Sequence, residues 1–346
     1  MKNIFFLSIF LLISGLIVGA RYFVIPHQQE VSSGDSRSVP EKKTLLSGYD
    51  NAVWDWKPFN RGAEFFEALK VRGVTTVYMN IGDYVDLYEM TDSEEKRKNI
   101  EDFNAKVKGY LALAKEKGLA VHALVGGANW GNASHRYLNK IVLDFVYDFN
   151  ILNPEFSFRG VQFDIEPYSQ EGFNPKKSQD VFMQYLDTVE EIITNFNNWQ
   201  SQSQQFASVQ LGFVIPYWLD GQDEYIQKTM WQEEEKYPFY HLLNRLNRTQ
   251  NGYVVIMAYR NFAEGSDGVI EHIQNEINFS QQYTPRIRVI IGQETSNEEP
   301  KKITFFGKSF NAMVEEVKKT GLKFEDSPNV AGFSFNNADS FLEMEW

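Results

Sequence analysis

Residues 159–168 have the sequence Arg159-Gly160-Val161-Gln162-Phe163-Asp164-Ile165-Glu166-Pro167-Tyr168. Apolar and polar side chains alternate along this stretch, which is the period-2 pattern of a β-strand with one hydrophobic and one polar face. Asp164 and Glu166 share the polar face, roughly 6.6 Å apart along the strand, so the charge of one raises the pKa of the other. Pro167 cannot donate to a strand ladder, and it therefore places Glu166 at the carboxyl end of the strand.

Two interpretations of this stretch stay open. In an α/β barrel the carboxyl end of the strands is where the chemistry takes place, and a carboxylic acid beside a second carboxylate can stay protonated near neutral pH. Alternatively, the acidic residues form structural ion pairs with Arg or Lys.

Eight short apolar runs alternate with amphipathic segments, which is the pattern of repeated βα units around a parallel sheet. The expected strands are Tyr49–Trp56, Thr75–Ile81, Ala120–Gly126, Val161–Glu166, Val209–Ile215, Tyr253–Tyr259, Ile287–Gly292 and Val330–Phe335. Eight strands close a TIM barrel. We therefore expect one (β/α)8 catalytic domain over residues 48–346 rather than two domains of average size.

The connections between these strands have helical periodicity. The expected helices are Gly62–Val71, Asp92–Lys117, Ala133–Phe149, Lys177–Asn197, Glu235–Leu246, Val269–Gln281 and Phe310–Lys319. Thr91 and Asp92 precede Glu94 and Glu95 in a capping-box arrangement, and Gly118 ends the same helix. The polar segment 195–205 predicts a loop. Only residues 336–346 follow the last strand, so the last helix is short or missing.

The first 25 residues have the pattern of an export signal, with Lys2 before an apolar run and small residues at Gly19 and Ala20. A cleaved signal peptide and an uncleaved signal anchor both stay open, because apolar residues resume at Tyr22. Residues 26–47 predict a disordered tether. We therefore expect an exported protein, periplasmic, secreted or at the cell surface, that meets the membrane only through its N-terminal segment if that segment is retained.

Composition excludes several classes of function. The chain is 43% hydrophobic and 23% charged, as in ordinary soluble globular proteins. Its net charge of −12 opposes binding to nucleic acid and to anionic lipid. The absence of cysteine excludes disulfides, thiolate metal sites and a cysteine nucleophile. The five histidines show no metal-ligand spacing, so we expect no bound metal. We also expect no cofactor, a monomeric protein, and an oligo- or polysaccharide as its binding partner.

Aromatic side chains gather at the expected carboxyl ends of the strands. Flat aromatic rings there stack on the apolar faces of sugars while their polar groups donate hydrogen bonds. The aromatic residues at or just after strand ends are Trp54, Trp56, Trp130, Tyr168, Tyr217, Trp218 and Tyr259. This gathering predicts a sugar-binding groove.

Three short motifs carry a resemblance to a known family: Gly126-Gly127 after the third strand, Asp164-x-Glu166 at the fourth and Met257-x-Tyr259 at the sixth. In order and placement they resemble the signature segments of glycoside hydrolase family 18, the chitinases and endo-N-acetylglucosaminidases. The resemblance implies that Glu166 is the general acid, that Asp164 orients the acetamido group of the substrate and that Tyr259 supports that group.

The chain departs from the family pattern at several positions. The two earlier aspartates of the fourth strand are Arg159 and Gln162 here, and the aspartate that usually follows Met-x-Tyr is Arg260. The usual tryptophan of the eighth strand is absent, with Asn336 nearby. These departures bear on chitin specificity more than on the general acid.

Three hypotheses for function follow. The first is hydrolysis of a β-glycosidic bond next to an N-acetylhexosamine, with retention of configuration and with the substrate's own acetamido oxygen as nucleophile. The second is a two-carboxylate retaining glycosidase with Glu166 as acid/base and Glu294 as nucleophile. The third is a carbohydrate-binding barrel without catalysis. The expected substrate contacts are Trp54, Trp56, Gly126, Gly127, Trp130, Gln162, Tyr168, Tyr217, Trp218, Arg260, Glu294 and Asn336.

Overall fold

The computed structural model describes residues 42–222 and 225–346. The expected export signal and the tether up to residue 41 lie outside the described residues. Residues 42–47 were expected in the tether, but the structure corrects that boundary. Leu45 is 3% exposed and its N–H donates to the carbonyl of Arg72, so this segment packs on the barrel.

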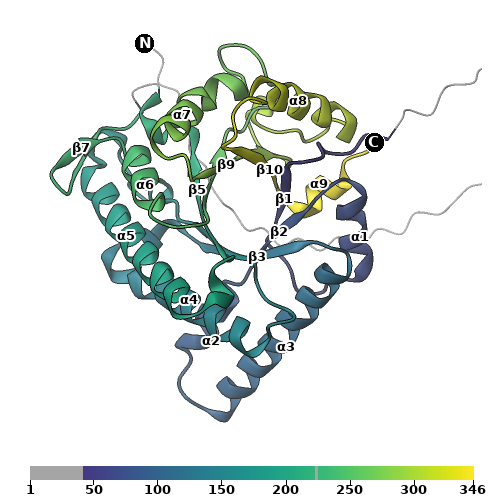
Figure 1. Ribbon diagram of the computed structural model, residues 1–346, viewed down its shortest axis with the longest axis vertical. Coiled ribbons are helices and arrows are strands. Elements are labelled where there is room, and N and C mark those ends of the chain that lie inside the picture. Colours follow the sequence, from purple (N-terminus) through teal and green to yellow (C-terminus); the bar gives the residue numbers. More distant parts are fainter. Residues whose placement is uncertain (1–41, 223–224) are drawn as a thin grey trace, which may run out of the picture. The chain divides into compact units, whose positions relative to one another are not determined.

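Eight parallel strands close into a barrel, which confirms the expected (β/α)8 TIM fold. In spatial order they are β1 (Asp50–Asp55), β10 (Val330–Asn336), β9 (Arg288–Glu294), β8 (Gly252–Met257), β5 (Gln210–Pro216), β4 (Gly160–Asp164), β3 (Ala120–Gly126) and β2 (Thr76–Asn80). Figure 1 shows the helices arranged around this ring of strands. Parallel strands run in one direction, so their carboxyl ends meet at one mouth of the barrel.

The helices are α1 (Ala63–Val71), α2 (Asp83–Glu89), α3 (Glu94–Glu116), α4 (Arg136–Leu152), α5 (Gln179–Gln202), α6 (Pro238–Leu246), α7 (Val269–Tyr283), α8 (Phe310–Lys323) and α9 (Ala338–Glu343). The six residues of α9 confirm the expected short last helix. Within the described ranges no helix has both the length and the apolar character needed to cross a bilayer.

Several boundaries differ from the expectation. The N-cap of α3 is Ser93, whose hydroxyl accepts from the Lys96 N–H, rather than Thr91 or Asp92. Helix α5 runs to Gln202 through the expected loop, because the buried Trp199 packs there against the core. Helix α2 was missed. A hairpin of β6 (Thr229–Trp231) and β7 (Glu234–Lys236) occupies the start of the expected helix from residue 235.

The barrel interior is filled by large side chains from several strands, among them Trp54, Tyr78 and Tyr253. Glycines opposite these rings make the room: a Cβ on Gly212 would lie 2.1 Å from the Tyr253 ring. The Trp54 indole N–H donates to Gln162 Oε1 at 2.7 Å, and Gln162 donates to the Tyr253 hydroxyl at 3.2 Å. This hydrogen-bonded packing forms the floor beneath the mouth.

Candidate active site at the barrel mouth

Asp164 is the last residue of β4, two residues before the predicted end of that strand. It follows Gln162 on the inward face, because side chains alternate along a strand. Its Oδ1 is buried and has no hydrogen-bond partner among the residues that the structure describes. Burial, and then the charge of Glu166, raise the pKa of Asp164 well above its ordinary value. An orphaned buried acceptor at this position is ready to receive a donor from a ligand.

Glu166 lies just beyond the strand and precedes the short 3-10 helix η3 (Pro167–Ser169). Burial raises the pKa of Glu166, while the Tyr168 hydroxyl, which donates to Oε1 at 3.0 Å, opposes this rise. Within the described residues neither Asp164 nor Glu166 forms an ion pair with a basic side chain. The described residues therefore give no support to the structural ion-pair interpretation, and the pair is suited to hold a proton near neutral pH.

Gly126 brings the backbone of β3 against β4 at this point. A Cβ on Gly126 would lie 1.9 Å from the Asp164 carbonyl oxygen, so no other residue fits without moving the strand. The next N–H, from Gly127, donates to the same carbonyl at 3.0 Å. The paired glycines thus position the backbone of Asp164. They allow strand β4, rather than a ligand, to lie close to the backbone of β3.

Tyr259 follows β8 and is partly buried. Its pKa lies well above the ordinary value, first because of burial and then because of the charges on Glu294, Asp164 and Glu166. Three carboxyl groups from two different strand ends therefore act on one phenol. The structure brings Asp164, Glu166, Tyr259 and Glu294 together at the mouth.

Arg260 is occupied within the protein, although the sequence placed it among the substrate contacts. It is 8% exposed, forms an ion pair with Asp267 at 2.7 Å and donates to the Tyr259 carbonyl at 2.7 Å. Its guanidinium also lies over the Tyr217 ring, 5.5 Å from the centroid. Arg260 thus fixes the backbone beside Tyr259. Its partner Asp267 was missed, because nothing in the local pattern marks it.

The expected aromatic contacts separate into two groups. Trp54 is 2% exposed inside the barrel and holds Gln162 there, so both are floor residues without a face open to a ligand, which corrects their assignment. Tyr168 and Trp218 pack edge to face with centroids 4.8 Å apart, and Trp130 is partly buried against the core. Tyr217 and Trp218 belong to the 3-10 helix η6 (Tyr217–Asp220) after β5.

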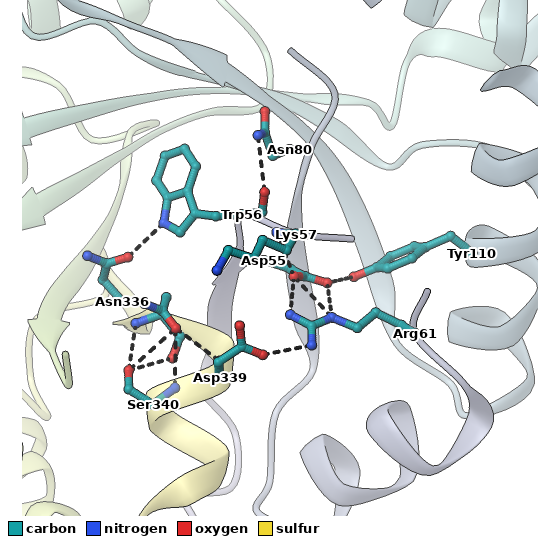
Figure 2. A network of polar contacts seen from close by, with 10 residues as sticks. Asp55, Trp56, Lys57, Arg61, Asn80, Tyr110, Asn336, Asp339 and Ser340 are labelled. Atoms are coloured by element: carbon teal, nitrogen blue, oxygen red, sulfur yellow. Dashed lines mark hydrogen bonds and ion pairs between the residues drawn. The ribbon is translucent and has the colours of Figure 1, made fainter. Parts of the chain in front are cut away.

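The indole of Trp56 points toward the end of β10 (Figure 2). Its N–H donates to Asn336 Oδ1 at 2.8 Å, and Asn336 Nδ2 donates to Glu294 Oε2 at 2.7 Å. The other oxygen of Glu294 accepts from the N–H groups of Thr295 at 2.8 Å and Ser296 at 2.6 Å. Both oxygens of the proposed nucleophile Glu294 are therefore engaged in hydrogen bonds within the protein.

A buried ion pair supports the same side of the mouth and was missed from the sequence. Asp55, which is fully buried, accepts from Arg61 at 2.7 Å and from the Tyr110 hydroxyl at 2.9 Å (Figure 2). Arg61 also pairs with Asp339 of α9 at 2.7 Å. The network ties β1, α3 and α9 together below Trp56. Asp55 points outward from β1, so its charge serves the scaffold.

Two surface hollows lie in the helical layer, away from the mouth. One of about 340 Å³ is lined by residues of α2, α3 and α4, including Tyr84, Lys108 and Phe145. The other, about 260 Å³, lies between α4 and α5. The described residues contain no cluster of three or more His, Cys, Asp or Glu side chains able to hold a metal ion.

No protein-family model and no curated protein sequence matches the chain. Solved structures share its fold. The catalytic domain of β-amylase from Paenibacillus polymyxa superposes with a TM-score of 0.52 at 7% identity, over 86% of this chain and 94% of that one. A GH18 chitinase from Pseudoalteromonas aurantia superposes with a TM-score of 0.50 at 10% identity, over 84% and 94%. At these identities the likeness establishes the barrel fold alone.

Proposed function

We propose that this chain is an exported glycoside hydrolase that cleaves a β-glycosidic bond next to an N-acetylhexosamine. One observation carries the proposal. The Asp164–Glu166 pair lies half-buried at the barrel mouth without a basic partner among the described residues, and Asp164 Oδ1 has no hydrogen-bond donor. A carboxyl pair that holds one proton and leaves one acceptor unsatisfied matches a substrate that needs one proton donor and offers one amide N–H.

The residues support a substrate-assisted reaction. Glu166, protonated, transfers its proton to the glycosidic oxygen as the bond from that oxygen to the anomeric carbon breaks. The acetamido oxygen of the same sugar attacks the anomeric carbon, while Asp164 accepts a hydrogen bond from the acetamido N–H. Water then attacks the anomeric carbon and opens the ring intermediate, giving its proton to the Glu166 carboxylate. Configuration is retained, and we assign to Tyr259 the support of the acetamido group.

The comparisons support the scaffold on which this proposal rests. A barrel with similarity to a GH18 chitinase agrees with the resemblance of the glycine, Asp-x-Glu and Met-x-Tyr motifs. The departures at Gln162 and Arg260 have local partners, since Gln162 binds Trp54 and Arg260 binds Asp267. Neither residue occupies the orphaned acceptor of Asp164.

The hydrogen bonds of Glu294 weigh against the two-carboxylate mechanism. Oε1 accepts two backbone N–H bonds and Oε2 accepts one from Asn336, and each bond stabilises the carboxylate charge and makes the oxygen a weaker nucleophile, although one lone pair of Oε2 stays free. We therefore place Glu294 outside the chemical step.

The decisive experiment compares three variants on N-acetylglucosamine oligomers. We expect Asp164→Asn to reduce kcat by about 10²-fold or more, as for Glu166→Gln, and Glu294→Gln to leave kcat within about tenfold. Oligomers that lack the acetamido group should be poor substrates for the wild-type protein. Equal loss in Glu294→Gln and Glu166→Gln, with no acetamido requirement, would establish the two-carboxylate mechanism instead.

A further inference from the structure

Trp56 is an aromatic side chain at the mouth that combines exposure with a hydrogen bond that orients its ring. It is 38% exposed, whereas Trp54 two residues earlier is buried in the floor. Tyr168 and Trp218 pack on each other, but in the described part of the chain no aromatic ring stacks on Trp56. A tryptophan ring that is partly open to solvent and held by a hydrogen bond beside the carboxyl groups of the mouth presents a face on which a sugar can stack.

The orientation of the Trp56 ring is set by a three-residue relay, defined here as Glu294, Asn336 and Trp56. The indole N–H has Asn336 Oδ1 as its acceptor at 2.8 Å. An Asn amide can be turned either way, but here its NH₂ must face the carboxylate of Glu294 and its oxygen must face the indole. The amide therefore has one allowed orientation, and the ring plane of Trp56 follows it.

Glu294 is the fixed end of the relay. It is 4% exposed, and the backbone N–H groups of Thr295 and Ser296 hold its Oε1. After burial, the charge of Glu294 is the largest contribution to the raised pKa of Tyr259. Glu294 thus connects the Trp56 side of the mouth with the side that carries Asp164 and Glu166. The backbone of Trp56 is held independently, since Asn80 Nδ2 donates to its carbonyl at 3.3 Å.

We propose that the exposed ring of Trp56 is the platform on which a pyranose of the bound glycan stacks, and that Glu294 is a positioning residue that acts on Trp56 through Asn336. That the ligand is a glycan rests on the proposed function. A flat ring face recognises a pyranose whose axial C–H groups form an apolar face, which favours β-linked sugars of the gluco configuration. The assignment also gives a role to Asn336, which lies near the position of the family's missing eighth-strand tryptophan. Strand β10 supplies this amide, and the amide orients a tryptophan that follows β1.

The test is steady-state kinetics on N-acetylglucosamine oligomers with Trp56→Ala, Asn336→Ala and the double variant. Loss of the platform should raise KM about 5- to 10-fold in Trp56→Ala, with kcat changed less than about threefold. Asn336→Ala should raise KM by a smaller factor. The double variant should match Trp56→Ala, because Asn336 acts through the indole. Tyr283→Ala, an exposed aromatic residue at the far end of α7, is the control and should leave KM unchanged.

The outcomes separate this inference from the proposed function. If the wild-type protein cleaves the oligomers and Trp56→Ala keeps its KM within twofold, the platform is wrong and the hydrolase stands. If the two single variants raise KM by factors that multiply in the double variant, Asn336 acts independently of Trp56 and the relay is wrong. Wild-type protein that neither binds nor cleaves these oligomers overturns the proposed function, and the assignment of Trp56 with it. Melting curves of each variant exclude loss of fold as the cause.

Discussion

Tyr168 tunes the proton affinity of the residue assigned as general acid. Burial raises the pKa of Glu166, and the Tyr168 hydroxyl at 3.0 Å favours the ionised form and lowers it. Tyr168→Phe removes the donor, so the pKa of Glu166 should rise further. A general acid works in its protonated form, so the alkaline limb of the kcat profile should move to higher pH.

The measurement is kcat from pH 4 to 9 for the wild-type protein, Tyr168→Phe and Tyr225→Phe. Tyr225 packs on the same Trp218 as Tyr168 and serves as the matched control. If the alkaline limb of the kcat profile moves to lower pH in Tyr168→Phe, or moves equally in both variants, the Tyr168 hydroxyl does not lower the pKa of Glu166.

Single residues also show what the sequence could and could not reveal. The alternation of residues 161–166 predicted the strand, but not that β4 ends at Asp164 and that Glu166 lies beyond it. The same alternation places Trp54 and Trp56 on one face, yet it says nothing of depth, and only the closed barrel shows that one is floor and the other is exposed. Likewise, the position of Glu294 at a strand end was predictable. Two of the hydrogen bonds that engage it come from the neighbouring Thr295 and Ser296 N–H groups, whereas the third comes from Asn336, which only folding brings close.

At the scale of elements, the contact between β3 and β4 determines where the carboxylate pair lies. A Cβ at Gly126 would collide with the Asp164 carbonyl oxygen at 1.9 Å. Gly126→Ala should therefore separate the strands, cost roughly 1–3 kcal/mol of stability and reduce kcat more than a stability loss elsewhere would.

The control for this variant is Gly109→Ala in α3, where a Cβ meets nothing within 4 Å. Replacing a helical glycine in open space should stabilise the protein by about 0.5–1 kcal/mol and leave kcat unchanged. Thermal melting and kcat measured on Gly126→Ala and Gly109→Ala test this prediction. A fully stable and active Gly126→Ala protein would show that the close approach is not required.

Local sequence patterns predicted the order and spacing of the strands and helices, but they did not predict where each element ends. The eight strands came from apolar runs between amphipathic segments, which are local properties of the chain. Helix α5 exceeded its predicted end because Trp199 packs against Tyr147 of α4, with centroids 5.5 Å apart, and against Phe206. That tertiary contact outweighs the polar character of residues 195–202, which alone favours a loop.

At the scale of the whole molecule, a buried acid away from the mouth couples folding to pH. Glu276 of α7 is 1% exposed, and within the described residues its carboxyl oxygens have no partner on another residue. Burial, and then the charge of Asp220, raise the pKa of Glu276 well above its ordinary value. A raised folded-state pKa contributes stability that is full below the ordinary pKa of glutamate and is lost as pH rises through the folded value.

Glu276→Gln keeps the shape of the side chain and replaces the carboxyl group by an amide that does not ionise. The variant should be more stable than the wild-type protein at neutral pH, and its Tm should fall less between pH 4.5 and 8. Glu271→Gln, at an exposed position of the same helix, is the control. A Tm profile of Glu276→Gln that is identical to that of the wild-type protein would contradict this account. The burial of Glu276 was missed from the sequence, although its spacing from Val269, Ile273 and Ser280 on the apolar stripe of α7 is a signal of it.

The most direct test of the central claim is the release of reducing ends from N-acetylglucosamine oligomers by the wild-type protein and by Glu166→Gln, with oligomer affinity measured alongside. The substitution keeps size and hydrogen bonding but removes the proton that leaves with the glycosidic oxygen. We expect turnover to fall by at least about 10²-fold while affinity stays within a few-fold. Equal turnover in the two proteins, or wild-type protein that binds the oligomers and releases no reducing ends between pH 4 and 8, would contradict the assignment of Glu166 as the general acid.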